Sequence, residues 1–322
     1  MTITQRNAVE VTDLRCRYGD FEAVRGISFT VRAGEVFALL GTNGAGKTTT
    51  VEVLEGFRPA HGGVAKVLGL DSYRQRRALR PRIGVMLQEA GFFGDLSVAE
   101  TVRLWEGLEA DTGRRPLGGA LERVGLKNKA RTKVRQLSGG QKRRLDLAMA
   151  IVTRPEVIFL DEPTTGMDPE ARRDTWAIIE ELRETGTTVL LTTHYLEEAE
   201  RLADRLAIMH EGRIHQYGTV EDVVATCGDR ISFRLAMSPQ ELRSRVGEGP
   251  PVLAGSAPTV TYMEEGIGVL YTLPGPSAPD TVQRAHYTLL SWADKHDLIL
   301  HRLELRKGTL EDAFLRVVGE AR

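Results

Sequence analysis

The amino-acid sequence predicts an α/β protein with a second, smaller α+β domain towards its C-terminus, and three observations support this fold class. Short alternating segments between Val9 and Leu40 indicate an antiparallel β layer. Farther along, the apolar runs IGVMLQ, EVIFLDEP and TTVLLTTH are separated by helical periodicity, which is typical of a mostly parallel sheet. Beyond about Gly228, clusters of glycine, proline and serine separate short elements, and this change indicates a new domain.

The composition is that of an ordinary globular protein. The 322 residues are enough for two domains, and 41% of them are hydrophobic, which is ample for packed cores. The formal net charge is −1, so we expect no nucleic acid among the partners. Three arginine pairs are interpreted as solvated helix faces, namely Arg76–Arg77, Arg143–Arg144 and Arg172–Arg173.

No segment of the sequence is expected to enter a membrane. No apolar run approaches the roughly 18 to 20 residues of a membrane span, and the start, MTITQRNAVEVTDLR, lacks the apolar core of a signal peptide. Cys16 and Cys227 match no metal-ligand spacing, so we expect a reduced compartment and no disulfide framework. Any work at a membrane is therefore expected to depend on a partner.

The first domain is expected to span residues 1–226 and to contain a helical insertion at about 89–153. Within the insertion no convincing strand occurs, and Ser97 with Glu100 fits a capping box at the start of the helix SVAETVRLWEGLEA. The segment DRLAIMHEGRIHQYG is predicted to close the domain as a β-hairpin with Glu211–Gly212 at its turn.

The second domain, 227–322, is predicted to have the element order β-α-β-β-α-β, which is a ferredoxin-like arrangement. It contains no group of residues that suggests catalysis, so stabilising a dimer, contacting a partner and sensing a regulator remain open as its role. The predicted elements are a strand over Ile231–Met237, a helix from Ser238, strands near Val260 and Val269, a helix over Asp280–Lys295 and a strand over Leu298–Leu305.

A phosphate-binding loop is predicted at GTNGAGKTT, residues 41–49. The stretch fits the pattern G-x-x-x-x-G-K-[ST], with an apolar strand over Val36–Leu40 before it and a helix through Leu54 after it. The glycines allow backbone N–H groups to wrap a β-phosphate. Lys47 is placed to reach the β- and γ-phosphates, and Thr48 is placed to offer its hydroxyl to Mg²⁺.

The stretch VIFLDEP supplies two carboxylates at the end of a buried strand. Asp161 is expected at the carboxyl edge of the sheet, where it is able to hold Mg²⁺ directly or through water. Glu162 follows it and is placed to polarise a water for attack on a γ-phosphate, a contribution of about 10² to 10⁴ in rate. Two carboxylates before a proline would not by themselves indicate catalysis. They do so here because the same chain also contains a phosphate-binding loop.

A third stretch, RQLSGGQKRRLDLAMA, opens a helix with two glycines. Ser138 and Gln141 fit a capping box, in which each side chain satisfies a backbone N–H of the other. Capping does not explain Gly139 and Gly140, since glycine in a helix costs up to roughly 1 kcal/mol relative to alanine. Bare amides at the positive end of a helix dipole suit an anion, so we predict that these glycines bind one.

In this order the motifs resemble those of the ATP-binding subunit of an ATP-binding cassette (ABC) transporter, over about Val9–Val224. The ordered set is GTNGAGKT, a glutamine after a strand, LSGGQ, VIFLDEP, GMDP and a histidine after TTVLLTT. The resemblance implies ATP and Mg²⁺ as cofactors. It further implies that Tyr18 stacks on adenine, and that Gln88 joins Thr48 at the Mg²⁺ and the attacking water. His194 is implied to approach the γ-phosphate.

The resemblance also implies a site shared between two copies of the chain. In this family LSGGQ contacts the nucleotide held by the other subunit's phosphate loop, so we expect a head-to-tail dimer with two ATP molecules inside. Asp168 is implied to lie in the loop that crosses this interface, although before Pro169 it also suits a helix cap. Met167 stands where the family more often has leucine, a change expected to have a small packing effect.

The residues expected at the bound cofactors follow from these assignments. Those expected at the nucleotide are Tyr18, Gly41, Thr42, Asn43, Gly44, Ala45, Gly46, Lys47, Thr48, Thr49, Ser138, Gly139, Gly140, Gln141 and Asp168. Those expected to act in catalysis are Lys47, Gln88, Glu162 and His194, and those expected at Mg²⁺ are Thr48, Gln88 and Asp161.

Two further stretches, THYLEEAERLADRLAIMHEGRI and GTLEDAFLRVVGE, are similar to the ATPase subunits of daunorubicin-type drug-resistance exporters. The similarity implies a peripheral protein at the cytoplasmic face of the cell membrane. It also implies a separate integral membrane permease that exports a drug or another hydrophobic small molecule. Phe92 and Phe93 follow the predicted nucleotide-sensing glutamine, and they either receive a helix of the permease or belong to the core.

Two other functions fit the sequence less well than export. A soluble cassette ATPase acting on nucleic acid, ribosomes or protein assembly is disfavoured by the near-neutral charge, the single cassette and the absence of a long coiled coil. A kinase with a phosphate loop would leave LSGGQ and His194 unexplained.

Overall fold

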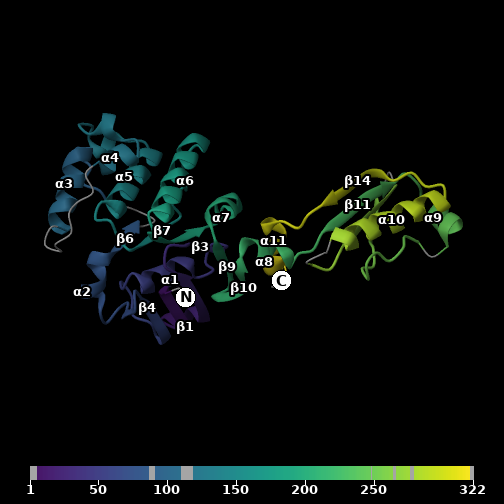
Figure 1. Ribbon diagram of the computed structural model, residues 1–322, viewed down its shortest axis with the longest axis horizontal. Helices are drawn as coiled ribbons and strands as arrows, with labels where there is room; N and C mark the ends of the chain where they lie inside the picture. The colour runs from purple at the N-terminus through teal and green to yellow at the C-terminus, as the bar shows by residue number, and fades with distance from the viewer. Residues whose placement is uncertain are drawn as a thin grey trace, which may run out of the picture. The chain divides into compact units, whose positions relative to one another are not determined.

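The chain divides into two compact units, Met1–Val220 and Glu221–Arg322 (Figure 1). The computed structural model describes residues 6–86, 91–109, 119–247, 249–263, 266–275 and 279–319. Cys16 and Cys227 are both free and buried. In these described ranges no helix has the length and apolar character needed to cross a membrane.

The core of the first unit is a mostly parallel sheet, as predicted. Its strands, in spatial order, are β10 (Arg213–Thr219), β9 (Arg205–His210), β3 (Val36–Gly41), β8 (Thr188–Thr193), β7 (Val157–Asp161) and β6 (Ile83–Met86). From β9 to β6 all neighbours are parallel, and the edge strand β10 is antiparallel to β9. Every residue of β3, β7 and β8 is buried, which explains why these segments read as continuous apolar runs.

The predicted antiparallel layer is present as a separate sheet that packs on the parallel one. It does not extend to Leu40 as predicted, because Val36–Leu40 belongs to β3 of the parallel sheet. Its strands, in spatial order, are β2 (Phe21–Arg32), β1 (Asn7–Tyr18), β4 (Gly62–Val67) and β5 (Leu70–Asp71). Both sheets and the helix α1 (Lys47–Leu54) contribute to one hydrophobic core. In this core Phe29 of β2 stacks on Phe37 of β3, with ring centroids 5.2 Å apart.

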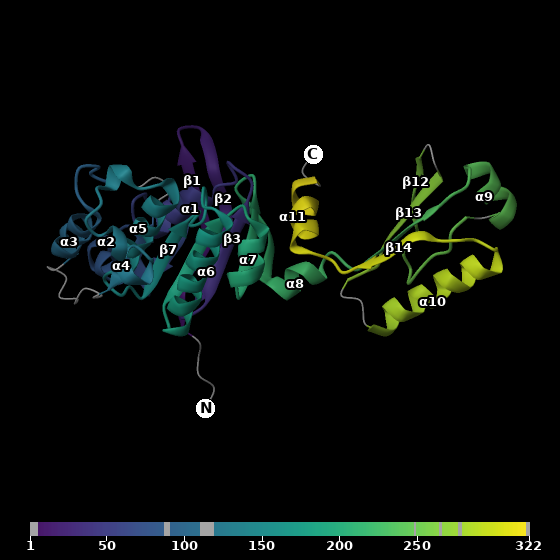
Figure 2. The same ribbon diagram turned by 90° about the horizontal axis from the view of Figure 1, so that it is seen from above.

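Two helices and a hairpin complete the sheet. Helices α6 (Pro169–Glu184) and α7 (Leu196–Leu202) lie side by side and pack against β8 and β3 (Figure 2). Strands β9 and β10 form the predicted hairpin, in which Glu211 and Gly212 have φ of 47° and 78°. Two successive positive φ angles are what a type I′ turn requires.

The helical insertion is confirmed, and the described residues 91–109 and 119–152 contain no strand. The predicted capping box is present at its first helix. Glu100 N donates to Ser97 Oγ at 3.2 Å, and Ser97 N donates to Glu100 Oε2 at 2.7 Å. The elements are α3 (Val98–Glu109), α4 (Ala120–Arg123), η3 (Lys127–Lys129), η4 (Val134–Gln136) and α5 (Gly139–Ile151), preceded by α2 (Arg76–Leu79) and η1 (Arg80–Arg82).

The second unit has the predicted ferredoxin-like order. Its strands, in spatial order, are β12 (Thr259–Met263), β13 (Gly266–Thr272), β11 (Arg230–Leu235) and β14 (His301–Arg306). Helix α9 (Pro239–Val246) follows β11 and α10 (Pro279–Lys295) follows β13, so each β-α-β unit is split by a strand of the other. Both helices pack on one face, since Leu242 and Leu289 share a core with Phe233.

The ends of the second unit differ from the prediction in two places. Strand β14 begins at His301 rather than Leu298, because Leu298 N donates to Ala293 O and so belongs to the cap of α10. Helices α8 (Val220–Ala225) and α11 (Leu310–Gly319) flank the six predicted elements in sequence.

Candidate functional site

The phosphate loop joins β3 to α1 and requires glycine at two positions. Gly46, directly before α1, has a φ of 99°, in the left-handed region that favours glycine. A Cβ at Gly46 would lie 2.5 Å from Ala23 O, and a Cβ at Gly41 would lie 2.5 Å from Met209 O. The loop is therefore held close to β2 and β9 by residues without side chains.

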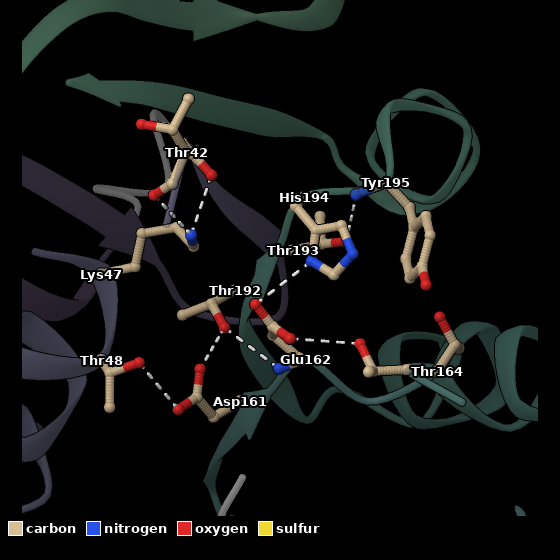
Figure 3. A network of polar contacts seen from close by, with 12 residues as sticks. Thr42, Lys47, Thr48, Asp161, Glu162, Thr164, Thr192, Thr193, His194 and Tyr195 are labelled. Carbon is tan, nitrogen blue, oxygen red and sulfur yellow. Dashed lines mark hydrogen bonds and ion pairs between the residues drawn. The ribbon is translucent and has the colours of Figure 1, made fainter. Parts of the chain in front are cut away.

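Lys47 points into this loop (Figure 3). Its side chain is largely buried, and Nζ donates to Gly41 O at 2.8 Å and to Thr42 O at 3.2 Å. Burial lowers the pKa of Lys47, while the charges of Glu162 and Asp161 oppose this shift. A phosphate in the loop would offer the ammonium a charged acceptor in place of two neutral carbonyls.

Asp161 and Thr48 form a small oxygen-rich centre. Thr48 Oγ1 donates to Asp161 Oδ2 at 3.1 Å, and Asp161 Oδ1 accepts from Thr192 Oγ1 (Figure 3). A hydroxyl and a carboxylate fit Mg²⁺, which prefers oxygen ligands and usually takes the rest of its shell from water and substrate phosphates. In the described parts of the chain, no group of three or more His, Cys, Asp or Glu residues is placed to hold a metal, so a metal here would depend on the hydroxyl, water and phosphates.

Glu162 and His194 come from the ends of two adjacent strands and meet at this centre (Figure 3). Glu162 Oε1 lies 3.2 Å from His194 Nδ1, and Glu162 Oε2 accepts from Thr165 Oγ1 at 3.2 Å. Glu162 has a φ of 51°. A left-handed conformation outside glycine costs about 1 to 3 kcal/mol and is typical of functional sites.

Tyr18 lines the cavity of about 300 Å³ that surrounds the phosphate loop. Its hydroxyl contacts Thr49 Oγ1 and Glu52 Oε2, each at 3.2 Å. The guanidinium of Arg58 lies over its ring, 4.1 Å from the centroid. Phe21, which the sequence analysis did not single out, lines the same cavity and is 58% exposed.

The LSGGQ segment begins α5, and its predicted capping box is confirmed. Gln141 N donates to Ser138 Oγ at 3.3 Å, and Ser138 N donates to Gln141 Oε1 at 3.1 Å. A Cβ at Gly139 would have no heavy atom within 4 Å, so the start of this helix is open on that side. None of the residues 138–141 is among the described residues that line the phosphate-loop cavity of the same chain.

Arg143 is a site residue that the sequence analysis missed. Its interpretation as part of a solvated helix face is wrong, because its side chain is only 10% exposed. The guanidinium donates to the carbonyl oxygens of Asp161 and Glu162, the latter at 2.7 Å. Arg143 therefore links the LSGGQ helix to the strand end that carries both acidic residues. The signal in the sequence that pointed to this residue was the pair Arg143–Arg144.

Asp168 caps α6, which confirms one of its two predicted roles. Its Oδ1 accepts from Ala171 N at 2.9 Å and from Glu170 N at 3.1 Å. The hydrogen bond from Ala171 N is the main cause that lowers the pKa of Asp168. Met167 is buried beside the cap, and its Sδ accepts from Thr175 Oγ1 at 3.3 Å.

A groove lies between the helical insertion and the β6 side of the parallel sheet. We call it the insertion groove. Its volume is about 460 Å³, and its lining residues are Glu55, Phe57, Arg80, Ile83, Gly84, Val85, Gly91, Phe92, Trp105, Asp146, Met149, Ala150 and Thr153. Phe93 is 69% exposed, so the core alternative is wrong for it. Gln88, predicted at Mg²⁺ and the attacking water, lies outside the described residues.

We expect Glu55→Gln to stabilise the isolated protein by an amount that grows with pH. Burial first, and then the charges of Asp161 and Glu52, raise the pKa of Glu55 from its ordinary 4.5 to about 9. Between these values the unfolded chain has released the proton and the folded chain has kept it. The free energy of unfolding of the wild type therefore falls as pH rises, and glutamine removes this loss.

Urea unfolding of the nucleotide-free chain measures the effect. The gain in the free energy of unfolding is expected to exceed about 1 kcal/mol near pH 8 and to vanish near pH 4. Glu184→Gln, at an exposed position of α6, is the matched control. A gain that does not depend on pH would contradict the assignment.

Comparison with known proteins gives relatives that match almost the whole chain. The daunorubicin resistance ATP-binding protein DrrA3 of Streptomyces coeruleorubidus is 39% identical over 98% of this chain and 97% of its own length. The Nod factor export ATP-binding protein I of Burkholderia pseudomallei is 44% identical, with 97% of each chain covered. The linearmycin resistance ATP-binding protein LnrL of Bacillus subtilis is 31% identical, with 97% and 98% covered.

Solved structures match the cassette part. The ATP-binding subunit of an ABC transporter has a TM-score of 0.61 and 29% identity, over 67% of this chain and 91% of that one. A subunit of the ABC transporter complex cbiONQ of Clostridium perfringens gives 0.60 and 29%, over 68% and 91%. A dimeric ATP-binding cassette bound to ADP and Pi, at 22% identity and 0.59 over 66% and 98%, shows the fold alone.

Two family models match parts of the chain. The model described as osmosensitive K⁺ channel His kinase sensor domain covers residues 112–259, which excludes the phosphate loop and runs across the boundary between the two units. The model described as ABC transporter covers residues 24–165, from β2 through the phosphate loop to the strand end with Asp161 and Glu162. Together with the full-length relatives, this match identifies the chain as an ATP-binding, ATP-hydrolysing member of the ABC transporter family.

Proposed function

We propose that this chain is the ATP-hydrolysing subunit of an exporter and drives a separate membrane permease. The observation that carries the proposal is the likeness of both units, over nearly the whole chain, to proteins named for daunorubicin resistance, Nod factor export and linearmycin resistance. The cargo is then a drug or another hydrophobic small molecule, and the chain works peripherally at the cytoplasmic face of the cell membrane. A soluble cassette acting on nucleic acid or ribosomes lacks comparable support.

The assigned residues have three roles in hydrolysis, which are binding of the phosphates, transfer of a proton and positioning of the reacting groups. The phosphate loop wraps the β-phosphate, and Lys47 reaches towards the γ-phosphate. Glu162 accepts the proton of the attacking water, and His194, 3.2 Å from its carboxylate, holds that side chain and approaches the γ-phosphate. When bound, Mg²⁺ neutralises charge on the phosphates. Thr48 and Asp161 hold it, together with Gln88.

The proposed working form is a head-to-tail dimer with two ATP molecules between the copies. The phosphate-loop cavity and the amides of Gly139 and Gly140 do not share a lining within one chain. A second copy supplies the missing half, with Asp168 in the loop that crosses the interface. ATP then closes the dimer, hydrolysis reopens it, and the permease follows this motion.

The proposal is tested by purifying the tagged full-length chain from detergent-solubilised membranes of cells that express it at its natural level. We expect one integral membrane protein to co-purify, to survive nuclease treatment and to raise the ATPase rate of the chain. The untagged chain is the control for non-specific capture. Recovery of nucleic acid or ribosomal proteins, or of no partner at all, would overturn the exporter proposal in favour of a soluble ATPase.

A further inference from the structure

Helix α7 contains, near its start, a carboxyl group that is sealed from solvent. Glu198 has no exposed surface, and its Oε1 accepts from Thr164 Oγ1 at 2.8 Å and from Trp176 Nε1 at 3.1 Å. Thr164 lies in the segment between β7 and α6, and Trp176 lies in α6. Acidic residues are rarely buried completely. This one is buried where two other elements of the fold meet α7.

The carboxyl joins the two segments that carry the candidate catalytic pair. Thr164 is two residues after Glu162, and His194 is four residues before Glu198. Only Tyr195, the N-cap residue of α7, separates His194 from that helix. The hydrogen bond from Thr164 to Glu198 therefore ties the segment that follows Glu162 to the helix that follows His194.

A second set of contacts holds the histidine segment to α6. The ring centroids of His194 and Tyr195 are 4.1 Å apart (Figure 3). The guanidinium of Arg172, near the start of α6, lies 4.7 Å from the centroid of the Tyr195 ring. The segment around His194 is thus attached to α6 through Arg172 as well as through Trp176.

The surroundings of Glu198 suit an acceptor. Burial raises the pKa of Glu198, and the side chains of Thr193, Thr164 and Trp176 oppose this shift, as does the charge of Arg172. Among the described residues Oε2 meets no donor with hydrogen-bond geometry, so the two measured bonds both end on Oε1. An indole N–H is only able to donate, so Oε1 has to remain an acceptor.

Packing alone does not account for a carboxyl at this position. An apolar side chain would fill the same space without the cost of removing a carboxyl from water. What the carboxyl adds is direction, because two donors from different elements fix its place and their own. The elements that it fixes are those on either side of the contact between Glu162 and His194.

We propose that Glu198 is a positioning residue for ATP hydrolysis and holds Glu162 and His194 in register. This rests on the proposed function, which gives those two residues their roles. Glu162 Oε1 lies 3.2 Å from His194 Nδ1, and the two side chains come from the ends of different strands. A misplacement of about 1 Å is able to cost about 10² in rate. Glu198 acts on this separation through Thr164 and through the start of α7.

Two substitutions, each removing one donor to Glu198 Oε1, test the proposal in the full-length chain. Thr164→Val cuts the tie towards Glu162 at constant size and is expected to lower kcat at least about tenfold, with KM for ATP within about twofold of the wild type. Trp176→Phe should keep kcat within about twofold, because Arg172 still holds Tyr195 to α6. A purely structural role predicts the reverse, since Trp176→Phe removes more buried volume. Equal losses of kcat would overturn the proposal.

Variants of Glu198 itself separate positioning from stability. Glu198→Met fills a similar volume without an acceptor and is expected to lower kcat as Thr164→Val does. Glu198→Gln keeps an oxygen for both donors and should restore most of the rate, so equal losses in these two variants would contradict the proposal. Glu197→Gln, at the exposed neighbouring position, is the matched control. Binding of a fluorescent ATP analogue counts folded sites, and if Glu198→Met does not fold, the two donor variants decide.

A double-mutant cycle tests whether the effect passes through the histidine. His194→Ala should lower kcat, and adding Thr164→Val to it should cause little further loss, because no imidazole remains to be positioned. Additive losses would overturn this inference alone. A wild-type kcat in His194→Ala would overturn the role proposed for His194, and this inference with it.

Discussion

Glu162→Gln is expected to lower the rate of ATP hydrolysis by about 10² to 10⁴ and to leave ATP binding intact. Glutamine keeps the size of the side chain and an oxygen for the hydrogen bond from Thr165 Oγ1, which the glutamate accepts at 3.2 Å. It is unable to take a proton from water at neutral pH. Steady-state phosphate release at saturating ATP and Mg²⁺ measures the loss, and binding of a fluorescent ATP analogue measures what remains.

The same variant should change the oligomeric state. If hydrolysis reopens the dimer, a chain that binds ATP without cleaving it should accumulate as the dimer, which light scattering reports with and without ATP. Glu197→Gln, at an exposed position of α7, is the control and should behave as the wild type. A hydrolysis rate of Glu162→Gln within about threefold of the wild type would contradict the role of Glu162 as the base.

The phosphate loop and its carboxylates were predictable from the sequence because each is a contiguous stretch with its own physical requirements. Gly46 needs a left-handed backbone, and Asp161 ends a strand of five buried residues. The element order of the second unit was predictable for a related reason, since its turns and apolar periodicity are local. In both cases the information lies within a few residues of chain.

The role of Arg143 was not predictable in this way. Whether an arginine on a helix meets solvent or a strand end depends on how α5 packs against β7, and this packing joins residues about 20 positions apart. The buried Glu198 is a similar case. It accepts hydrogen bonds from Thr164 Oγ1 at 2.8 Å and Trp176 Nε1 at 3.1 Å, and so ties α7 to the segment after Glu162. The sequence around it shows only an acidic helix.

Glu55 and Asp146 show a second limit of reasoning from sequence. Glu55 directly follows the last residue of α1 and Asp146 lies within α5, and an acidic residue in a sequence is ordinarily assigned to the solvated surface. Both residues are buried and line the insertion groove, one from the end of α1 and the other from α5. A property that arises only when distant segments meet, such as a buried carboxyl, is visible only in the fold.

Lys47→Ala and Gly139→Glu are each expected to abolish ATP hydrolysis, and mixing the two variants is expected to restore part of it. Lys47→Ala removes the ammonium that reaches the phosphates. Gly139→Glu places a carboxylate where the amides of LSGGQ are proposed to meet a γ-phosphate, and repulsion of like charges prevents closure. The fold should tolerate it, because a Cβ at Gly139 has no heavy atom within 4 Å.

Recovery in the mixture tests the shared site directly. In a mixed dimer one site combines both defects, and the other combines the intact phosphate loop of one chain with the intact LSGGQ of its partner. Random pairing makes about half of the dimers mixed, so about a quarter of all sites are intact. Phosphate release by the equimolar mixture should approach that fraction if the sites act independently.

Two controls test whether lost glycine flexibility or unfolding, rather than a shared site, explains the loss of activity in the single variants. Gly139→Ala adds a methyl group without a charge, so it should retain most of the activity and exclude an effect of lost glycine flexibility. Both inactive variants should keep the melting temperature of the wild type to within a few degrees. If phosphate loop and LSGGQ of the same chain formed the site, every site in the mixture would carry one defect. The mixture would then stay inactive, and the two glycines at the start of α5 would need another explanation.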